Sequence, residues 1–435
     1  MSAPGTINAG YLESLLAGQP HLPVSPLAWL NALRAEAVER VGALTVPTLR
    51  DEEWRFTDIS LLTKMSFHPV RTTISLQAAD IERFYIKEAT TRLVFVDGVY
   101  APQLSSGITD NGVAVINLEA GFGAYAAAIE PYLGRLTEFR DNVFAALNTA
   151  FLHDAALIVV PRDISVAVPV HLLFIATQKD VVSYPRCLLM AESGSAVTVI
   201  EDYVSLQEEA YFTNAVTEIA LVDNARVNHI RVQREGVKAF HIANCAVSLA
   251  RASNYQSVSV AFGARISRYN LNVQLAEEAE CAVDGLALIS GRQLADTHTC
   301  IDHAKPHAVS HQMHKCIVGG SAHAVFNGKI MVRQGAQRTD SRQSSRNLLL
   351  TSKAHVDTKP QLEIFADDVK CTHGATIGQL DNDEVFYLQS RGLSETAARN
   401  MLTYAFGAEI IERISISSLK SRLEQTVLEQ TTIQP

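Results

Sequence analysis

The stretch EIALVDNARVNHIRV (residues 218–232) shows the pattern that dominates the chain. Apolar and polar residues alternate on either side of Asp223-Asn224, which is typical of two half-buried strands joined by a turn. Seven further runs of this kind lie between about residues 155 and 388: ALIVVP, VHLLFIA, AVTVIEDYVSL, ANCAVSLA, SVSVAF, RYNLNVQLA and CAVDGLALIS. So many short strands without intervening helices predict a large, mainly β body.

Three architectures fit such a body: a sandwich, a barrel and a solenoid. The runs follow no fixed repeat period, which argues against a regular solenoid. Tight Asn-Gly or Asp-Gly turns are few, whereas a sandwich with this many strands usually needs more of them. A parallel β-helix with irregular coils satisfies both observations, but composition alone does not decide between the three.

Both ends of the chain have helical patterns, so we expect a helical region over residues 1–91, a β core over 92–388 and a second helical region over 389–435. Ser394 can cap a C-terminal helix. One side of that helix would carry Ala397, Met401, Tyr404, Ala405, Ala408 and Ile411. A second apolar stripe follows over residues 418–430. These stripes must pack on the β body, on a copy of the chain or on a partner protein.

Charge and composition exclude several classes of protein. The 435 residues include 37 basic and 46 acidic side chains, for a net charge of −9, and 47% are hydrophobic. This composition is incompatible with wholesale disorder, and the acidic balance argues against a nucleic-acid-binding protein. The apolar runs are strand-sized, well short of the roughly 20 residues that cross a bilayer. We therefore expect no nucleic-acid or membrane partner.

The cysteines and the N-terminus indicate the compartment. Six cysteines are spread through the chain without a CxxC motif, which is typical of free thiols in a reducing cytosol. The first twenty residues lack the basic region of a signal peptide and contain Glu13 beside a short apolar patch. The sequence therefore predicts a cytoplasmic protein.

The densest group of potential metal ligands is THTCIDHAKPHAVSHQMHKC (residues 297–316). Its histidines and cysteines are His298, Cys300, His303, His307, His311, His314 and Cys316. Pro306 opposes a continuous helix, so we expect strands. His298, Cys300 and Asp302 would then share one face, as would His307 and His311. The spacing matches no zinc-finger or HExxH pattern, so two readings stay open: a metal site, or histidines in ladders on successive strands.

A second candidate is DDVKCTHGATIG (residues 367–378). On a strand, Cys371 and His373 would point the same way, with Cα atoms roughly 6.5–7 Å apart. A thiolate and an imidazole at that spacing can bind one metal ion or adjacent irons of a cluster. Two ligands alone make an open, weak site, which suits delivery better than storage.

Common catalytic motifs are missing from the sequence. It contains no GxSxG elbow, no P-loop GxxxxGK[ST] and no GxGxxG after a strand. The carboxylates are scattered and form no recognisable acid/base pair. We therefore expect that the chain is not itself an enzyme.

The stretch DTKPQLEIFADDVKCTHGATIGQLDNDEVFYLQSRGL (residues 357–393) closely resembles the SufB/SufD family of iron–sulfur cluster assembly proteins. Three further blocks agree with this resemblance: EEWRFTDISLL (52–62), LVFVDGVY (93–100) and HAVFNGKI (323–330). The resemblance implies a right-handed parallel β-helix flanked by helical N- and C-terminal regions, and thereby selects one of the three architectures.

Within the family, the DTKPQLEI and CTHGAT stretches resemble the SufD branch. SufB members carry a functional cysteine upstream of the corresponding block, where this chain reads SRQSSRNLLL (residues 341–350) without cysteine. The resemblance implies that His373, together with the neighbouring Cys371, binds iron or a nascent cluster at an interface with SufB. No tightly bound cofactor is implied for the isolated chain.

The resemblance also implies partners. Similar proteins pair with SufB through the β-helix and bind the ABC-type ATPase SufC through the C-terminal region. Ser394, Met401, Tyr404 and Ile411 are then candidate contacts to SufC, and ATP hydrolysis on SufC would account for the missing P-loop. A homodimer is possible when the chain is isolated. The competing hypothesis is a stand-alone metalloenzyme that uses the histidines of residues 297–316.

Overall fold

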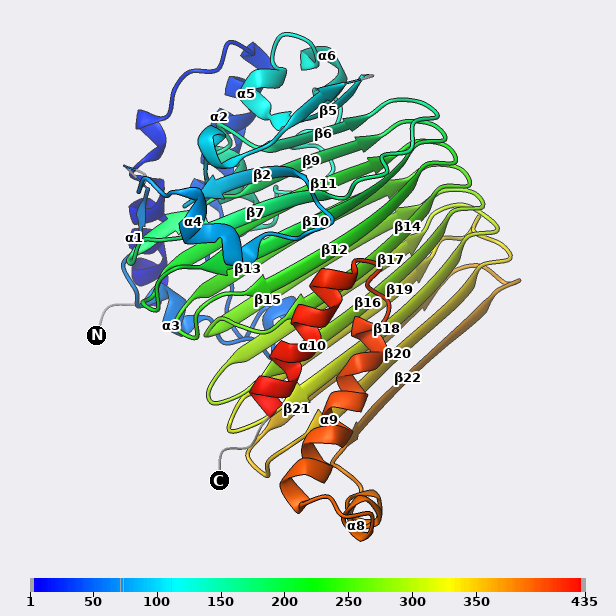
Figure 1. Cartoon of the computed structure of the whole chain (residues 1–435). Helices are drawn as coiled ribbons and strands as arrows, with labels where there is room; N and C mark the ends of the chain where they lie inside the picture. The colour runs from blue at the N-terminus through cyan, green and yellow to red at the C-terminus, as the bar shows by residue number, and fades with distance from the viewer. Residues whose placement is uncertain (1–3, 71, 73, 111, 432–435) are drawn as a thin grey trace.

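From residue 186 onward, strands that follow one another in the sequence lie alternately in two sheets, so the chain winds as a coil between them (Figure 1). The computed structural model describes residues 4–70, 72, 74–110 and 112–431. The twelve-stranded sheet has, in spatial order, β21 (His355–Ile364), β19 (His323–Val332), β17 (Leu294–His303), β15 (Ile266–Leu275), β13 (Phe240–Leu249), β11 (Phe212–Leu221), β9 (Arg186–Ala191), β6 (Ala156–Val160), β5 (Val113–Asn117) and β4 (Ile108–Asp110), with β1 (His68–Pro69) and β8 (Val181–Ser183) paired beside it.

The ten-stranded sheet contains the alternate strands. In spatial order they are β22 (Lys370–Gly378), β20 (Asp340–Leu349), β18 (Val309–Val318), β16 (Glu280–Ile289), β14 (Asn254–Ala261), β12 (Arg226–Arg234), β10 (Ala196–Ser205), β7 (Val170–Ala176), β2 (Thr91–Val96) and β3 (Val99–Tyr100). All pairings from β7 onward are parallel, so the predicted parallel β-helix is confirmed.

The coils are unequal in length, which explains why the sequence shows no fixed period. Phe240, Ile266, Leu294, His323 and His355 are successive partners in one sheet. The spacing grows from 26 residues (240 to 266) to 32 residues (323 to 355). The strands stay in register while the turns between them change length.

Side chains from both sheets fill the interior of the coil. Val227 and Tyr255 from one sheet pack with Cys245 and Leu271 from the other. The interior also holds paired charges, for example His229 and Glu201, whose Nε2 and Oε1 atoms lie 3.4 Å apart. Buried ionisable groups need such partners because an isolated charge would lose its hydration without compensation.

N-terminal helices cover the outer face of the twelve-stranded sheet. The helices before the core are α1 (Pro4–Leu16), α2 (Ala28–Ala43), α3 (Ser60–Thr63) and α4 (Ala78–Ile81), and three more lie inside the predicted β region: α5 (Leu118–Gly121), α6 (Ala126–Ile129) and α7 (Val143–Ala150). The exception is α4, which packs against β2 and β7 of the ten-stranded sheet. Leu30 and Phe144 pack with Phe212 of β11 in one buried cluster. A buried ion pair, Arg186 to Glu218 at 2.5 Å, supports this layer, because Glu218 also accepts backbone N–H groups of the loop after α6.

Two of the three C-terminal helices, α9 and α10, lie across the outer face of the ten-stranded sheet, and α8 projects beyond its end (Figure 1). The three helices are α8 (Asn382–Ser390), α9 (Glu395–Ile411) and α10 (Ser417–Thr431), so the helical region begins before the predicted residue 389. Ile410 and Leu419 are fully buried against Ile230 and Val260 of the sheet. Of the three alternatives for the apolar stripes, the structure therefore shows packing on the β body. No helix in the described part of the chain is long and apolar enough to span a membrane.

Candidate functional site at the open end of the β-helix

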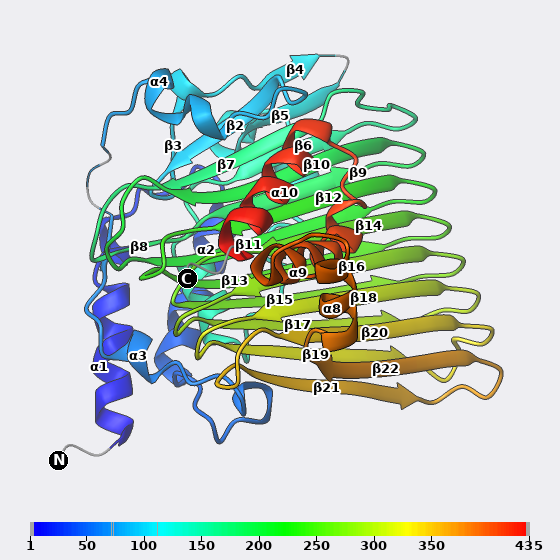
Figure 2. The same cartoon turned by 60° about the horizontal axis from the view of Figure 1, so that its bottom comes forward.

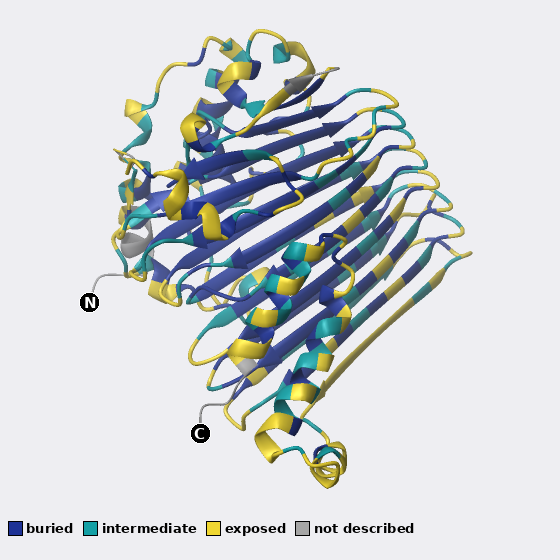
Figure 3. Cartoon of the chain, in the orientation of Figure 1, coloured by how far each residue is buried: buried dark blue, intermediate teal, exposed yellow. Residues whose placement is uncertain are grey.

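The β-helix is closed at one end and open at the other. Short antiparallel strands, β3 and β4, finish the two sheets at the N-terminal end. At the other end β21 and β22 are the last strands, and no described strand pairs with their outer edges (Figure 2). β22 is exposed along almost its whole length (Figure 3). Apolar side chains also reach solvent here: Ile364, Phe365 and Ile377 are 39%, 63% and 48% exposed.

Cys371 and His373 lie on β22 and face the same way. In the parallel register, Cys371 is the partner of Ser341 and His373 is the partner of Gln343. Ser341 and Gln343 are buried in the interior, so their partners on β22 stand over the open end of the same interior. Cys371 is half-buried and packs against the interior apolar cluster, whereas His373 is exposed.

Two rows of hydrogen-bonded side chains lead from the interior to these residues. In the first, Ser310 Oγ lies 2.8 Å from His303 Nε2 and 2.8 Å from Ser341 Oγ. In the second, Gln343 Nε2 donates to Gln312 Oε1 at 2.9 Å. The glycine of HAVFNGKI makes room for this row, because a Cβ atom on Gly328 would lie 2.4 Å from Gln343 Nε2.

The second row ends at Gln343, next to His373 on the last strand. Within the described chain, the buried Oε1 atom of Gln343 has no hydrogen-bond partner. Burial, with a smaller contribution from Asp340, raises the pKa of the Cys371 thiol. Its thiol is therefore protonated at neutral pH, and His373 is the readier ligand.

Of the histidines of residues 297–316, His298 and His303 lie on β17 and His311 and His314 lie on β18, as expected, but they do not converge. His298 and Cys300 are on the outer face of β17, while His303 and His314 point into the interior. His314 stacks on Phe326 with ring centroids 4.6 Å apart. The prediction that His307 and His311 share a face is wrong, because His307 lies in the turn with a φ of 64°. In the described chain these histidines form no common ligand set.

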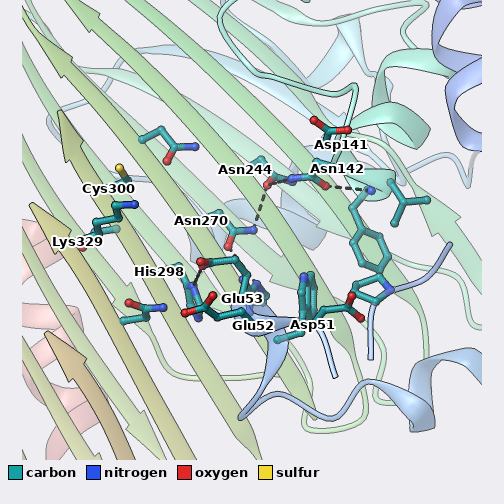
Figure 4. Close-up of a pocket in the computed structure, with 18 of the residues that line it drawn as sticks. Asp51, Glu52, Glu53, Asp141, Asn142, Asn244, Asn270, His298, Cys300 and Lys329 are labelled. Carbon is teal, nitrogen blue, oxygen red and sulfur yellow. Dashed lines mark hydrogen bonds and ion pairs between the residues drawn. The ribbon is translucent and has the colours of Figure 1, made fainter. Parts of the chain in front are cut away.

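His298 lines a cavity between the twelve-stranded sheet and the N-terminal segment around Glu53 (Figure 4). The cavity holds about 690 Å³. His298 Nε2 lies 3.0 Å from Asp296 and its Nδ1 lies 3.3 Å from Glu53. Although burial favours the neutral imidazole, Asp296 and Glu53 raise the pKa of His298. Burial raises the pKa of the neighbouring Cys300 thiol. The site is thus a closed ion-pair network and not a ready metal site.

The candidate docking residues on α9 fall into two groups. Ser394 is exposed and caps the helix, its Oγ accepting from Ala397 N at 3.2 Å, and Met401 is 53% exposed. Tyr404 is partly buried, packed against the cluster that joins α9 to the sheet. Ile411 is fully buried in that cluster, so it is withdrawn as a docking residue.

The sequence reasoning missed two features of this end of the molecule. Phe386 and Tyr387 of α8 are 70% and 56% exposed. His323, His355 and Asp357 come together on the outer face of β19 and β21. This group could be predicted from the sequence only if it were known that His323 and His355, 32 residues apart, are partners on neighbouring strands.

Comparisons with known proteins agree with the fold and the motifs. A family model described as the SufBD protein N-terminal region matches residues 8–172, and one described as the SUF system FeS cluster assembly, SufBD core domain, matches residues 174–406. An iron–sulfur cluster assembly SufBD family protein of Synechocystis sp. is 42% identical, covering 91% of this chain and 89% of its own.

Two further relatives span nearly the full length. The iron–sulfur cluster assembly protein SufD of Escherichia coli is 33% identical over 94% of this chain and 97% of its own. The chloroplastic protein ABCI7 of Arabidopsis thaliana is 32% identical over 95% of this chain and 89% of its own. With both family models and these relatives in agreement, the chain belongs to the SufB/SufD family of iron–sulfur cluster assembly proteins, on its SufD side.

Proposed function

We propose that this chain is the SufD-like subunit of a scaffold formed with SufB and the ATPase SufC, and that nascent iron–sulfur clusters are built where it meets SufB. The observation that carries the proposal is the position of His373 and Cys371 over the open end of the β-helix, on a strand whose outer edge pairs with no strand among the described residues. Iron and the cluster are cargo here, held during assembly and then released.

The free strand edges at the open end favour the binding of a second β-helix. Free strand edges readily pair with another chain, and natural proteins usually protect them. A partner with a similar open end would cover Ile364, Phe365 and Ile377 and would extend the sheets across the interface. It would also bring its own ligands against His373.

The chemistry of the two side chains suits temporary binding. Imidazole and thiolate both ligate the iron of clusters. His373 can bind directly, whereas Cys371 must first lose the proton that burial helps it to keep. With so few ligands from this side, a cluster would remain exchangeable.

The exposed residues of α8 and α9 fit a second partner. Phe386, Tyr387 and Met401 leave apolar surface in solvent on the helical region that the family resemblance assigns to SufC. ATP hydrolysis would take place on SufC, so this chain would not itself be an enzyme and would hold no tight cofactor when isolated. We place the complex in the cytoplasm.

The test uses the chain co-expressed with SufB and SufC. We expect His373→Ala to reduce the cluster absorption of the reconstituted complex at least fivefold, because the ligand on this side is removed. Thr372→Ala is the matched control, since it lies on the same exposed strand with its side chain on the opposite face. Full cluster assembly by a His373→Ala complex that purifies intact would refute the ligand role.

A further inference from the structure

His323, His355 and Asp357 form a compact group on the outer face of the twelve-stranded sheet. Each offers one ligand atom, and the three atoms lie within 4.8 Å of one another. His323 Nε2 is 2.7 Å from Asp357 Oδ2, and His355 Nε2 is 3.2 Å from the same oxygen. Two imidazole nitrogens thus approach a single carboxylate oxygen from adjacent strands.

The backbone holds these residues in place. His323 and His355 are direct register partners at the first positions of β19 and β21, and Asp357 follows two residues later on the same face. Neighbouring strands lie about 4.8 Å apart, which brings the two rings together without any loop rearrangement. The ring centroids are 4.9 Å apart. A ligand set built on strands is more rigid than one built on loops.

The distances suit a shared metal ion. A transition metal takes nitrogen and oxygen ligands at about 2.0–2.2 Å, so ligands of one ion lie roughly 3–3.5 Å apart. The two nitrogen–oxygen distances in this group are close to that range. The side chains of His323 and Asp357 are 27% and 25% exposed, and that of His355 is 65% exposed. An ion could therefore enter from solvent and keep water at its remaining positions.

We propose that His323, His355 and Asp357 bind one divalent transition-metal ion, of the Fe²⁺ to Zn²⁺ range, at the open end of the β-helix. Two imidazoles with one carboxylate favour such ions over Ca²⁺ and Mg²⁺, which prefer oxygen ligands alone. The site is separate from His373, which lies on the other sheet, and it does not depend on the proposed scaffold function.

The test measures Zn²⁺ binding by calorimetry to the tag-free full-length chain. The background carries Cys371→Ser and His373→Ala, so that the cluster-ligand candidates contribute nothing. We expect one Zn²⁺ per chain, with affinity reduced at least tenfold by His355→Ala and by Asp357→Asn. His311→Ala, an exposed strand histidine outside the group, is the matched control and should bind as the background does.

A second readout separates loss of the site from loss of the fold. Co²⁺ bound to nitrogen and oxygen ligands has visible absorption bands, and these should vanish in His323→Ala while its thermal unfolding midpoint stays near that of the background. Binding should also weaken on acidification, because protons compete for the imidazoles. Failure of the background chain to bind Zn²⁺ or Co²⁺, or unchanged affinity in both histidine variants, would overturn the proposal.

Discussion

At the scale of single residues, the N-terminal segment contacts a buried ion pair between two strands of the β-helix. Arg268 donates to Asp296 at 2.5 Å, and its guanidinium also lies 3.8 Å from the centre of the Trp54 ring. Burial opposes ionisation of Asp296, but Arg268 and His298 outweigh it and lower the pKa to about 2. Because the folded pKa lies below the ordinary value near 4, ionised Asp296 stabilises the fold above pH 4, and this contribution is lost as the pH falls towards 2.

Asp296→Asn should therefore lower the free energy of unfolding by about 3–5 kcal/mol at pH 7, since it leaves Arg268 buried without its partner. The difference from the unchanged chain should shrink by about 2 kcal/mol between pH 4 and pH 2. Urea unfolding at several pH values measures both effects. The control is Asp302→Asn on the same strand, whose partner Arg333 is exposed, and it should cost less than about 1 kcal/mol. A constant difference across this pH range would contradict the pKa argument.

The sequence was enough to predict which residues of one strand share a face, but not which residues of two strands lie side by side. Period-two spacing on one strand is enough to place Cys371 and His373 on the same face, as the structure shows. The group of His323, His355 and Asp357 depends on which residue of β21 lies beside His323. That register is determined by turn lengths that vary from coil to coil, so no local pattern reveals it.

At the scale of elements, α9 shows why an apolar stripe can mislead. The sequence pointed to a face with Met401 and Ile411, but the buried face carries Ala398, Thr403 and Gly407 together with Ile410 and Ile411. Small residues let the helix approach the sheet closely, since a Cβ atom on Gly407 would lie 3.3 Å from Ile317 Cδ1. A prediction based on the positions of apolar residues overlooks buried glycine and threonine. The buried face predicted for α9 is therefore turned away from the face that packs on the sheet.

The packing of α9 leads to a direct prediction. Ile411→Ala should destabilise the chain by about 2–5 kcal/mol because it opens a cavity beneath the helix, and amides of α9 and α10 should then exchange hydrogen faster. Met401→Ala removes an exposed side chain from the same helix and should change stability by less than about 0.5 kcal/mol. Hydrogen-exchange mass spectrometry with denaturant titration tests both. Equal effects of the two substitutions would show that the helix is not held by this face.

At the scale of the whole molecule, the two ends of the β-helix differ, and only one of them leaves strand edges open to another chain. Each coil is stabilised chiefly by its neighbours, so a solenoid needs a cap where the stacking stops. Antiparallel strands and helices cap the N-terminal end, whereas β21 and β22 end the sheets with free edges in the described chain. The alternation of apolar and polar residues was enough to predict the β body. Which end of the β-helix is open depends on how the strands pair, and this is seen only in the structure.

The open end should make the isolated chain self-associate. When isolated, the chain can cover the edges of β21 and β22 and the exposed Phe365 only by pairing with a second copy. We expect a concentration-dependent dimer in analytical ultracentrifugation, weakened at least tenfold by Ile377→Lys, because a charge on β22 opposes edge pairing. Val237→Lys, at an exposed apolar residue on the distant turn between β12 and β13, should leave the dimer unchanged. If neither Ile377→Lys nor Phe365→Lys weakens the dimer, the two copies contact each other elsewhere. If the unchanged chain is monomeric at all concentrations, free strand edges alone do not drive association.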